Sequence, residues 1–386
     1  MTEYDAIVIG VGAMGAAACA HLAARGARVL GLERFAIPHE HGSSGSDTRL
    51  FRTAYFEHPD YVPLLRRARA GWEHLESRTG ARVFDETGVL YAGPPDGELI
   101  PATESSARAY GVEVEEVADA PSRHPAFRIP GGYRVLFEPG AGFVRSLAAI
   151  RAFAGAARAD GAELHEGERV VEWEERGAGV RVRTDAGAYE ANRLVLTAGA
   201  WTPQVAPGLA GRLTPTRQVV GWVEPRAPSA CVPPAFPCWA IEDPEDGLYY
   251  GFPLVDDPST DPARRGLKIG RHVPGPPIDP DHVGPASIAG DEPHFRRGVE
   301  RYLGAVGGVT TAVTACLYTM SPDGHFMVGP LPDHDAAVVA CGFSGHGFKF
   351  APVIGEALAD LALEGRTELP VGFLSPLRGD RAGGAA

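Results

Sequence analysis

Residues 4–33 read YDAIVIGVGAMGAAACAHLAARGARVLGLE and contain the pattern that decides the fold. The apolar run at residues 4–9 is typical of a strand buried on both faces of a parallel sheet. The alanine-rich stretch 13–25 predicts a helix, and Gly26 lies where a helix C-terminal glycine belongs. Residues 28–33 (RVLGLE) predict a second strand. Together these elements form one βαβ unit at the start of the chain.

Three glycines lie between the first strand and the helix of this unit. Gly10, Gly12 and Gly15 form a GxGxxG pattern, and Glu33 follows Gly15 by 18 residues at the end of the second strand. The glycines allow a tight turn, close approach of a pyrophosphate and close packing of helix on strand. The helix N-terminus offers N–H groups and positive potential to phosphates, and the acidic residue accepts from a ribose hydroxyl. The pattern predicts binding of an ADP-containing dinucleotide, and it does not distinguish NAD from FAD.

Two kinds of strand pattern alternate along the rest of the chain. Apolar strands at 193–201 and 336–341 are expected to join the parallel sheet, with helices at 62–78, 146–159 and 350–363. Strands at 87–91, 133–137, 218–223, 248–252 and 267–272 are expected to form a second, antiparallel sheet. The pattern predicts an α/β (α+β) protein with a Rossmann-type domain from residues 1–83, 142–213 and 325–386, and a substrate domain from residues 84–141 and 214–324. The segment 35–61 between these elements is expected to be an irregular, functional loop.

Composition excludes several classes of protein. The chain has 386 residues, a formal net charge of −13 and five cysteines without a CxxC pair. Nucleic acid is not an expected partner, because phosphate-backbone binding needs a basic surface. The odd cysteine count disfavours a disulfide framework and a zinc site, so we expect a cytoplasmic protein without a metal. No membrane partner is expected either, because no apolar run approaches about 18 residues.

Ten sequence blocks then carry a specific resemblance. They are YDAIVIGVGAMGAA, DTRLFRTAY, YVPL, ETGVLY, RLVLTAGAW, RQVVGW, GLYYGFP, GLKIGRH, ACLYTMSPDGHF and GFSGHGFKFAP. In these blocks, over nearly its full length, the chain resembles the monomeric sarcosine oxidase and N-methyltryptophan oxidase family of FAD-dependent amine oxidases. The resemblance implies an FAD-binding domain, oxidation of a secondary amine to an imine, and reduction of O2 to H2O2 by a monomer. It also implies a covalent thioether between Cys316 and the flavin.

The resemblance and the glycine pattern together predict the residues that bind FAD. The glycine-rich stretch 342–347 precedes a helix, whose N–H groups suit the negative charge of a reduced flavin. The expected cofactor-binding residues are Gly10, Gly12, Ala13, Met14, Gly15, Glu33, Arg34, Ser43, Thr48, Arg49, Val170, Ala198, Gly199, Trp201, Cys316, Gly342, Phe343, Gly345, His346, Gly347 and Lys349.

Arg52 and Lys349 match the pair that holds the substrate carboxylate in this family. Lys268 and His272 lie four residues apart on an expected strand, so both side chains point to one face, which we expect to look toward the flavin. A buried cation there favours electron transfer to oxygen, which creates negative charge. We therefore expect Lys268 to activate oxygen.

Two tyrosines complete the expected catalytic group. Tyr250 is expected to line the substrate pocket, whereas Tyr249 on the opposite face is expected to lie in the core. Tyr318, two residues after Cys316, is expected to point back toward the flavin.

The chain also departs from the family pattern. Ser44 and Gly45 stand where the sarcosine-type enzymes have a histidine pair, Ala240 is smaller than the usual residue, and Arg271 adds a charge. A small residue at position 240 predicts a substrate bulkier than sarcosine, such as an N-methylated or cyclic amino acid or a specialised-metabolite intermediate. Alternatives are a flavin-dependent amine dehydrogenase, a fructosyl amino acid oxidase and a non-catalytic nucleotide-binding protein.

Overall fold

The computed structural model describes residues 3–255, 260–282, 284 and 286–378. Its first large sheet has β1 (Tyr4–Ile9) between β12 (Ala188–Leu196) and β2 (Val29–Glu33), parallel to both. β19 (Ala337–Cys341) extends the parallel part beside β12, and β9 (Glu163–Glu166) extends it beside β2. The remaining, antiparallel strands are β10 (Val170–Arg176), β11 (Gly179–Thr184) and β18 (Met327–Pro330).

A layer of helices packs on this sheet. α1 (Ala13–Ala24) contacts α5 (Ser146–Ala159) and α8 (Ala351–Glu364), and α8 contacts α2 (Tyr61–Thr79). Ten of the 12 residues of α1 are buried, which explains why its sequence is alanine-rich rather than amphipathic. The helix N-terminus lies directly after β1, as the βαβ pattern predicts.

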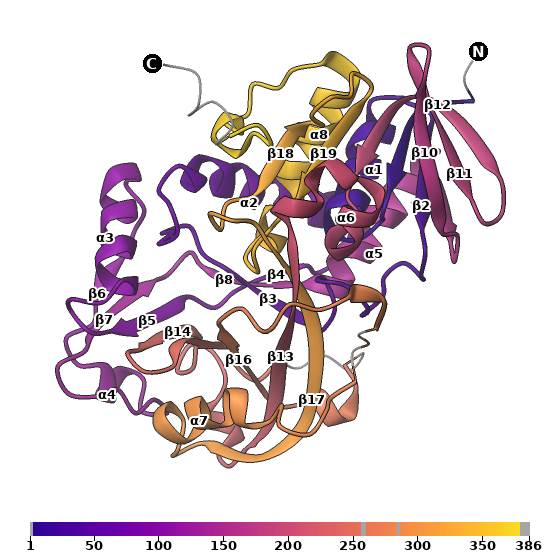
Figure 1. The fold of residues 1–386 in the computed structure, drawn as a ribbon. Helices are drawn as coiled ribbons and strands as arrows, with labels where there is room; N and C mark the ends of the chain where they lie inside the picture. Colours follow the sequence, from indigo (N-terminus) through magenta and orange to yellow (C-terminus); the bar gives the residue numbers. More distant parts are fainter. Residues whose placement is uncertain (1–2, 256–259, 283, 285, 379–386) are drawn as a thin grey trace.

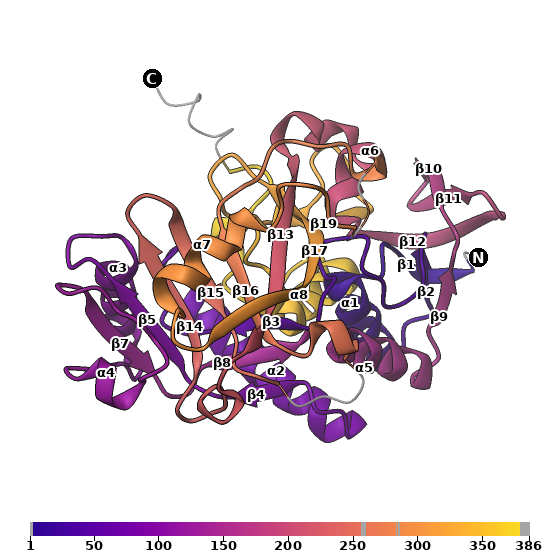
Figure 2. The ribbon, with the colours of Figure 1, turned by 90° about the horizontal axis from the view of Figure 1, so that it is seen from below.

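The second large sheet lies beside the first (Figures 1 and 2). Its order is β17-β13-β16-β15-β14-β5-β7-β6, and every described pair is antiparallel except β14 with β5. The strands are β5 (Val89–Gly93), β6 (Glu115–Glu116), β7 (Arg134–Glu138), β13 (Thr214–Pro225), β14 (Cys238–Asp243), β15 (Gly247–Gly251), β16 (Leu267–His272) and β17 (Gly307–Met320). The long strands β13 and β17 run from this sheet toward the first sheet (Figure 1).

Smaller elements complete the fold. A three-stranded sheet has the order β3-β8-β4. Its strands are β3 (Thr48–Phe51), β4 (Phe84–Glu86) and β8 (Gly142–Arg145), and the other helices are α3 (Leu99–Tyr110), α4 (Ala120–Arg123), α6 (Thr202–Val205) and α7 (Pro293–Tyr302). Short 3-10 helices are η1 (Gly199–Trp201), η2 (Pro207–Arg212), η3 (Pro228–Ala230), η4 (Pro262–Arg264), η5 (Pro280–His282), η6 (Phe348–Phe350) and η7 (Gly372–Leu374). Among the described residues, no helix combines the length and apolar character needed to cross a membrane.

The predicted α/β (α+β) class is confirmed, and two local predictions are corrected. The segment 35–61 is not wholly irregular, because it contains β3, which pairs with β8. The strand expected at 193–201 ends at Leu196, since η1 follows from Gly199. The predicted domain boundaries stay a prediction, although each large sheet draws its strands from separate parts of the chain.

Candidate active site

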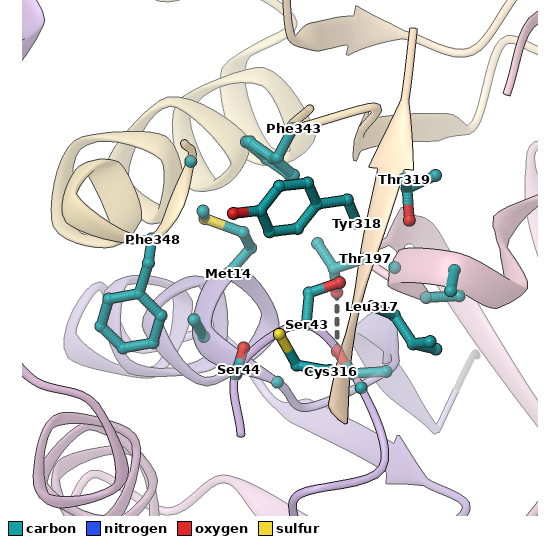
Figure 3. A pocket seen from close by; sticks show the side chains of 18 of the residues that line it. Met14, Ser43, Ser44, Thr197, Cys316, Leu317, Tyr318, Thr319, Phe343 and Phe348 are labelled. Carbon is teal, nitrogen blue, oxygen red and sulfur yellow. Dashed lines mark hydrogen bonds between the residues drawn. The ribbon is translucent and has the colours of Figure 1, made fainter. Parts of the chain in front are cut away.

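One large cavity lies where the two large sheets meet. It holds about 1980 Å³ of space between atoms, part of it open to solvent, and it extends from the β1–α1 turn to the second sheet. Its walls come from the β1–α1 turn, the loop after β2, five strands of the second sheet and the turn before α8. Figure 3 shows the part of the cavity around Cys316, where Met14, Phe343 and Tyr318 also lie.

The β1–α1 turn has the shape that a bound pyrophosphate needs. Gly10 has a φ of +89°, and a Cβ on Gly15 would lie 1.9 Å from the Gly10 carbonyl oxygen, so both positions require glycine. At Gly12, by contrast, a Cβ would meet only the Ser44 hydroxyl, at 3.8 Å. The space over Gly12 is therefore open beside the N-terminus of α1, and these residues fit a dinucleotide.

Glu33 is held rigidly at the next strand end. Its buried carboxylate accepts hydrogen bonds from the backbone N–H groups of Val11 (2.9 Å) and Phe35 (3.0 Å). It lines the cavity, together with Arg34 and Trp201. The carboxylate thus supports the glycine turn and lies at the predicted ribose side of the site.

Most of the predicted cofactor-binding residues line this one cavity. They are Gly10, Gly12, Ala13, Met14, Glu33, Arg34, Ser43, Arg49, Val170, Ala198, Gly199, Trp201, Cys316, Gly342, Phe343, Gly345, His346, Gly347 and Lys349. Gly15 and Thr48 lie outside the lining: Gly15 packs helix on strand, and Thr48 binds a lysine described below.

Arg49 organises the loop that faces Cys316. Its guanidinium donates to the Ser46 hydroxyl (2.8 Å), the Thr48 carbonyl (2.9 Å) and the Ser43 carbonyl (3.0 Å). These bonds fix the loop against the cavity wall, so Ser43 and Ser44 lie opposite β17 (Figure 3).

Cys316 and Tyr318 point into the cavity from the same face of β17 (Figure 3). The thiol is buried, and burial raises its pKa, while the nearby cations Arg49 and Lys268 oppose that rise. The other four cysteines are free and buried as well, but none of them lines the cavity. Cys316 is therefore the thiol placed to meet a cofactor.

Lys268 lies one layer behind the cavity wall. Its ammonium group donates to the Ser46 hydroxyl (2.8 Å) and to the carbonyl (2.7 Å) and hydroxyl (3.3 Å) of Thr48. Burial and the neighbouring Arg49 lower the pKa of Lys268 well below its usual range. Lys268 is not among the residues that line the cavity, whereas its hydrogen-bond partner Ser46 is, and the expected place of Lys268 beside the flavin stays a prediction.

His272 and two tyrosines form a neutral wall of the cavity. His272 Nδ1 lies 3.2 Å from the Tyr318 hydroxyl, and burial lowers the pKa of His272 to about 4. Tyr250 also lines the cavity. Tyr249 points away from it and donates to Asp246 (3.1 Å). Tyr249 and Tyr250 thus lie on opposite faces of β15, as strand alternation predicts.

Two buried cations from separate segments converge in the cavity. Arg52 follows β3 and Lys349 precedes α8, and both line the same cavity. Arg52 pairs with Glu57 at 2.5 Å, and its guanidinium lies 4.4 Å from the Tyr55 ring centre. Lys349 donates to the His346 carbonyl at 2.8 Å. A carboxylate ligand here meets two cationic donors.

Glu57 is a cavity residue that the sequence analysis missed. Its side chain pairs with Arg52, and although burial opposes ionisation, Arg52 and His346 hold the pKa of Glu57 at about 2. Among the described residues, Arg52 Nη1 and Glu57 Oε2 are buried without a hydrogen-bond partner. The only sequence signal was a carboxylate five residues after Arg52 in a functional loop.

A dinucleotide turn, a buried thiol and paired cations in one cavity are typical of an enzyme that binds a dinucleotide cofactor. The chain belongs to the FAD dependent oxidoreductase family, which matches residues 5–361. The family resolves the choice between NAD and FAD that the glycine pattern left open, and the protein is an FAD-dependent oxidoreductase.

Characterised relatives cover almost the whole chain. The monomeric sarcosine oxidase of Streptomyces avermitilis is 38% identical over 97% of both chains. The N-methyl-L-tryptophan oxidase of Yersinia pestis is 34% identical over 97% of this chain and 99% of its own. The resemblance stated from the ten sequence blocks is thereby confirmed.

Solved structures agree with the fold. NikD, "an unusual amino acid oxidase essential for nikkomycin biosynthesis", has a TM-score of 0.83 at 27% identity and covers 97% of both chains. L-proline dehydrogenase from P. horikoshii has a TM-score of 0.81 at 21% identity, which shows a shared fold alone.

Proposed function

We propose that the protein is an oxidase that converts an N-methyl or cyclic amino acid to its imine and reduces O2 to H2O2. The observation that carries this proposal is the convergence of Arg52 and Lys349 in the cavity that also contains the glycine turn and Cys316. When bound, FAD supplies the acceptor for the hydrogen and two electrons of amine oxidation and passes the electrons to oxygen.

The chain's own residues would hold FAD along the cavity. Gly12 and the N-terminus of α1 would bind the pyrophosphate, and Glu33 the ribose. The N–H groups at 342–347 suit the ring system, and Cys316 would form the thioether. We further propose a cytoplasmic location, since all five cysteines are free, as in reducing compartments. The similarity to a monomeric sarcosine oxidase supports a monomer.

The cations also select the reactive form of the substrate. Arg52 and Lys349 orient the carboxylate by charge-assisted hydrogen bonds. Positive charge beside a bound amine lowers the pKa of that amine, which favours the neutral form that can release hydride. His272 adds no positive charge, since its pKa is about 4. The site then needs no separate general base.

The floor of the cavity supports a bulky substrate. Ala240 on β14 pairs with Tyr91 of β5 on one side and Tyr250 of β15 on the other, and it lines the cavity. The Tyr250 ring lies over Gly270, where a Cβ would be only 2.6 Å from it. The ring thus leans away from Ala240, where the amino acid side chain can extend.

Peroxide release across sarcosine, N-methyl aromatic and cyclic amino acids tests the proposed substrate class. We expect the bulky amino acids to be preferred, and we expect Ala240→Met to shift the ratio of kcat/KM values toward sarcosine by roughly tenfold or more. Ala240→Gly, which adds no volume, is the control and should keep the preference. Far better turnover of sarcosine by the unchanged protein would contradict the bulky-substrate proposal.

The role of Lys349 predicts a pH dependence of carboxylate binding. Burial and the nearby Arg52 lower the pKa of Lys349 to about 7, so the cation is present below that pH and is lost as the pH rises through it. Propionate carries no amine and is ionised throughout this range. Its dissociation constant, read from flavin absorbance, should therefore rise about tenfold between pH 6 and pH 9, because a charged hydrogen bond contributes about 1.5–3 kcal/mol.

Lys349→Met is the control for this titration. It should bind propionate weakly at pH 6 and show no further weakening at higher pH, because Arg52 stays charged. His272 and His346 have pKa values of about 4 and about 3, outside the titrated range. The same pH dependence in Lys349→Met would rule out Lys349 as its origin.

A further inference from the structure

Glu138 is a buried carboxylate behind the cavity wall. It is the last residue of β7, its side chain is 2% exposed, and it does not line the cavity. Its Oε1 accepts from the backbone N–H of Thr53 (2.7 Å), and the Ala54 N–H lies 3.3 Å from both carboxylate oxygens. Its Oε2 accepts from the Tyr91 hydroxyl (2.6 Å). Burying a carboxylate is costly, and here three uncharged donors compensate it.

The two backbone amides belong to the residues directly after Arg52. On the other side of Arg52, Phe51 pairs with Gly142 in the β3–β8 ladder. The backbone at Arg52 is therefore fixed on one side by a sheet and on the other by Glu138. Beyond Ala54 the loop carries Glu57, the ion-pair partner of Arg52.

We propose that Glu138 is a positioning residue for substrate binding, which aims the Arg52 guanidinium into the cavity by holding the Thr53 and Ala54 amides. This inference rests on the proposed role of Arg52 in binding the substrate carboxylate. Because β7 belongs to the second large sheet and β3 to the three-stranded sheet, Glu138 also ties the arginine loop to the sheet that carries Ala240 and Tyr250.

Electrostatics agrees with this placement. Burial raises the pKa of Glu138, while the hydrogen bonds from Tyr91, Thr53 and Ala54, together with the charge of Arg52, oppose the rise. The Tyr91 hydroxyl stays protonated and remains a donor, because burial and Glu138 raise its pKa well above the usual value. Tyr91 therefore acts as a donor to Glu138, and the Glu138 carboxylate accepts from the Thr53 and Ala54 amides.

The test is propionate binding to flavin-loaded Glu138→Gln, measured by flavin absorbance. The amide keeps the shape of the side chain, but its NH2 group meets donors where the carboxylate had acceptors. We expect the propionate dissociation constant and the substrate KM to rise about tenfold, with kcat at saturation within about threefold. A structural defect alone would lower kcat and flavin content as well. An unchanged dissociation constant would overturn the inference.

Tyr91→Phe is the matched control, because it removes one donor to Glu138 and leaves both backbone amides in place. It should change propionate binding less than about twofold. If Glu138→Gln does not fold, Glu138→Asp, whose carboxylate is one methylene shorter, is measured in the same way. Normal propionate binding by Glu138→Asp would then overturn the inference.

Arg52→Met separates this inference from the proposed function. If Arg52→Met binds propionate normally, the proposed role of Arg52 is wrong, and the inference falls with it. If Arg52→Met weakens binding and Glu138→Gln does not, only the positioning role is wrong. If both weaken it, adding Glu138→Gln to Arg52→Met should change binding less than about twofold, because the two act through one group. If Glu138→Gln weakened propionate binding in the Arg52→Met background as much as it does alone, action of Glu138 through Arg52 would be ruled out.

Discussion

Substitution of Lys268 by Met should slow the reoxidation of the reduced enzyme by O2 about 100- to 1000-fold, the usual effect of removing one preorganised electrostatic group. The first electron transfer to oxygen creates negative charge, which the protonated form of Lys268 would stabilise, although burial and Arg49 lower the pKa of Lys268. Lys268 is fixed by three hydrogen bonds to Ser46 and Thr48, so it needs no reorganisation when that charge appears. Anaerobic reduction by the amine should change little, because the carboxylate-binding residues are untouched.

Rapid mixing resolves the two half-reactions. Lys268→Arg is the matched control, since it keeps a positive charge and should retain most of the reoxidation rate. Equal slowing of reduction and reoxidation in Lys268→Met would indicate a general defect of the site instead of a role in oxygen activation.

Substitution of Cys316 by Ala should abolish covalent attachment completely. Cys316 is the cavity-lining cysteine among the five, and its sulfur points into the pocket beside Ser43 and Ser44 (Figure 3). After acid precipitation, the unchanged protein should stay yellow, whereas Cys316→Ala should release its flavin into the supernatant. Flavin content before precipitation is the measured reference.

Cys238→Ala provides the control for this experiment, because Cys238 is buried in the second sheet and does not line the cavity. It should keep acid-stable yellow colour. Release of all flavin from the unchanged protein by acid would contradict a thioether at Cys316.

The parts of the fold that depend on local patterns were predictable. The βαβ unit and the helix Ser146–Ala159 follow from apolar runs, alanine content and glycine positions alone. Strand β17 was not predicted, because its first half is polar and partly exposed, with no apolar alternation. Helix α7 was missed as well, although its buried residues Phe295, Val299 and Tyr302 have the i, i+4, i+7 spacing of an amphipathic helix.

The site was predictable where a motif carried it and not where contacts between distant segments decide it. Cys316, Arg52 and Lys349 lie in motifs and converge as expected. Glu138 lies 85 residues from its amide partner Thr53, a relation that no sequence spacing reveals. Strand alternation places Lys268 on the face of His272, which lines the cavity, but it could not show the hydrogen bonds of Lys268 to Ser46 and Thr48.

Anaerobic mixing of the purified protein with N-methyl and cyclic amino acids, followed by admission of air, tests the central claim most directly. We predict that at least one of these amines bleaches the yellow flavin. We also predict that air restores the colour with one H2O2 formed per amine oxidised. Failure of every such amine to bleach the flavin, or recovery of colour that needs an added electron acceptor instead of oxygen, would contradict an amine oxidase.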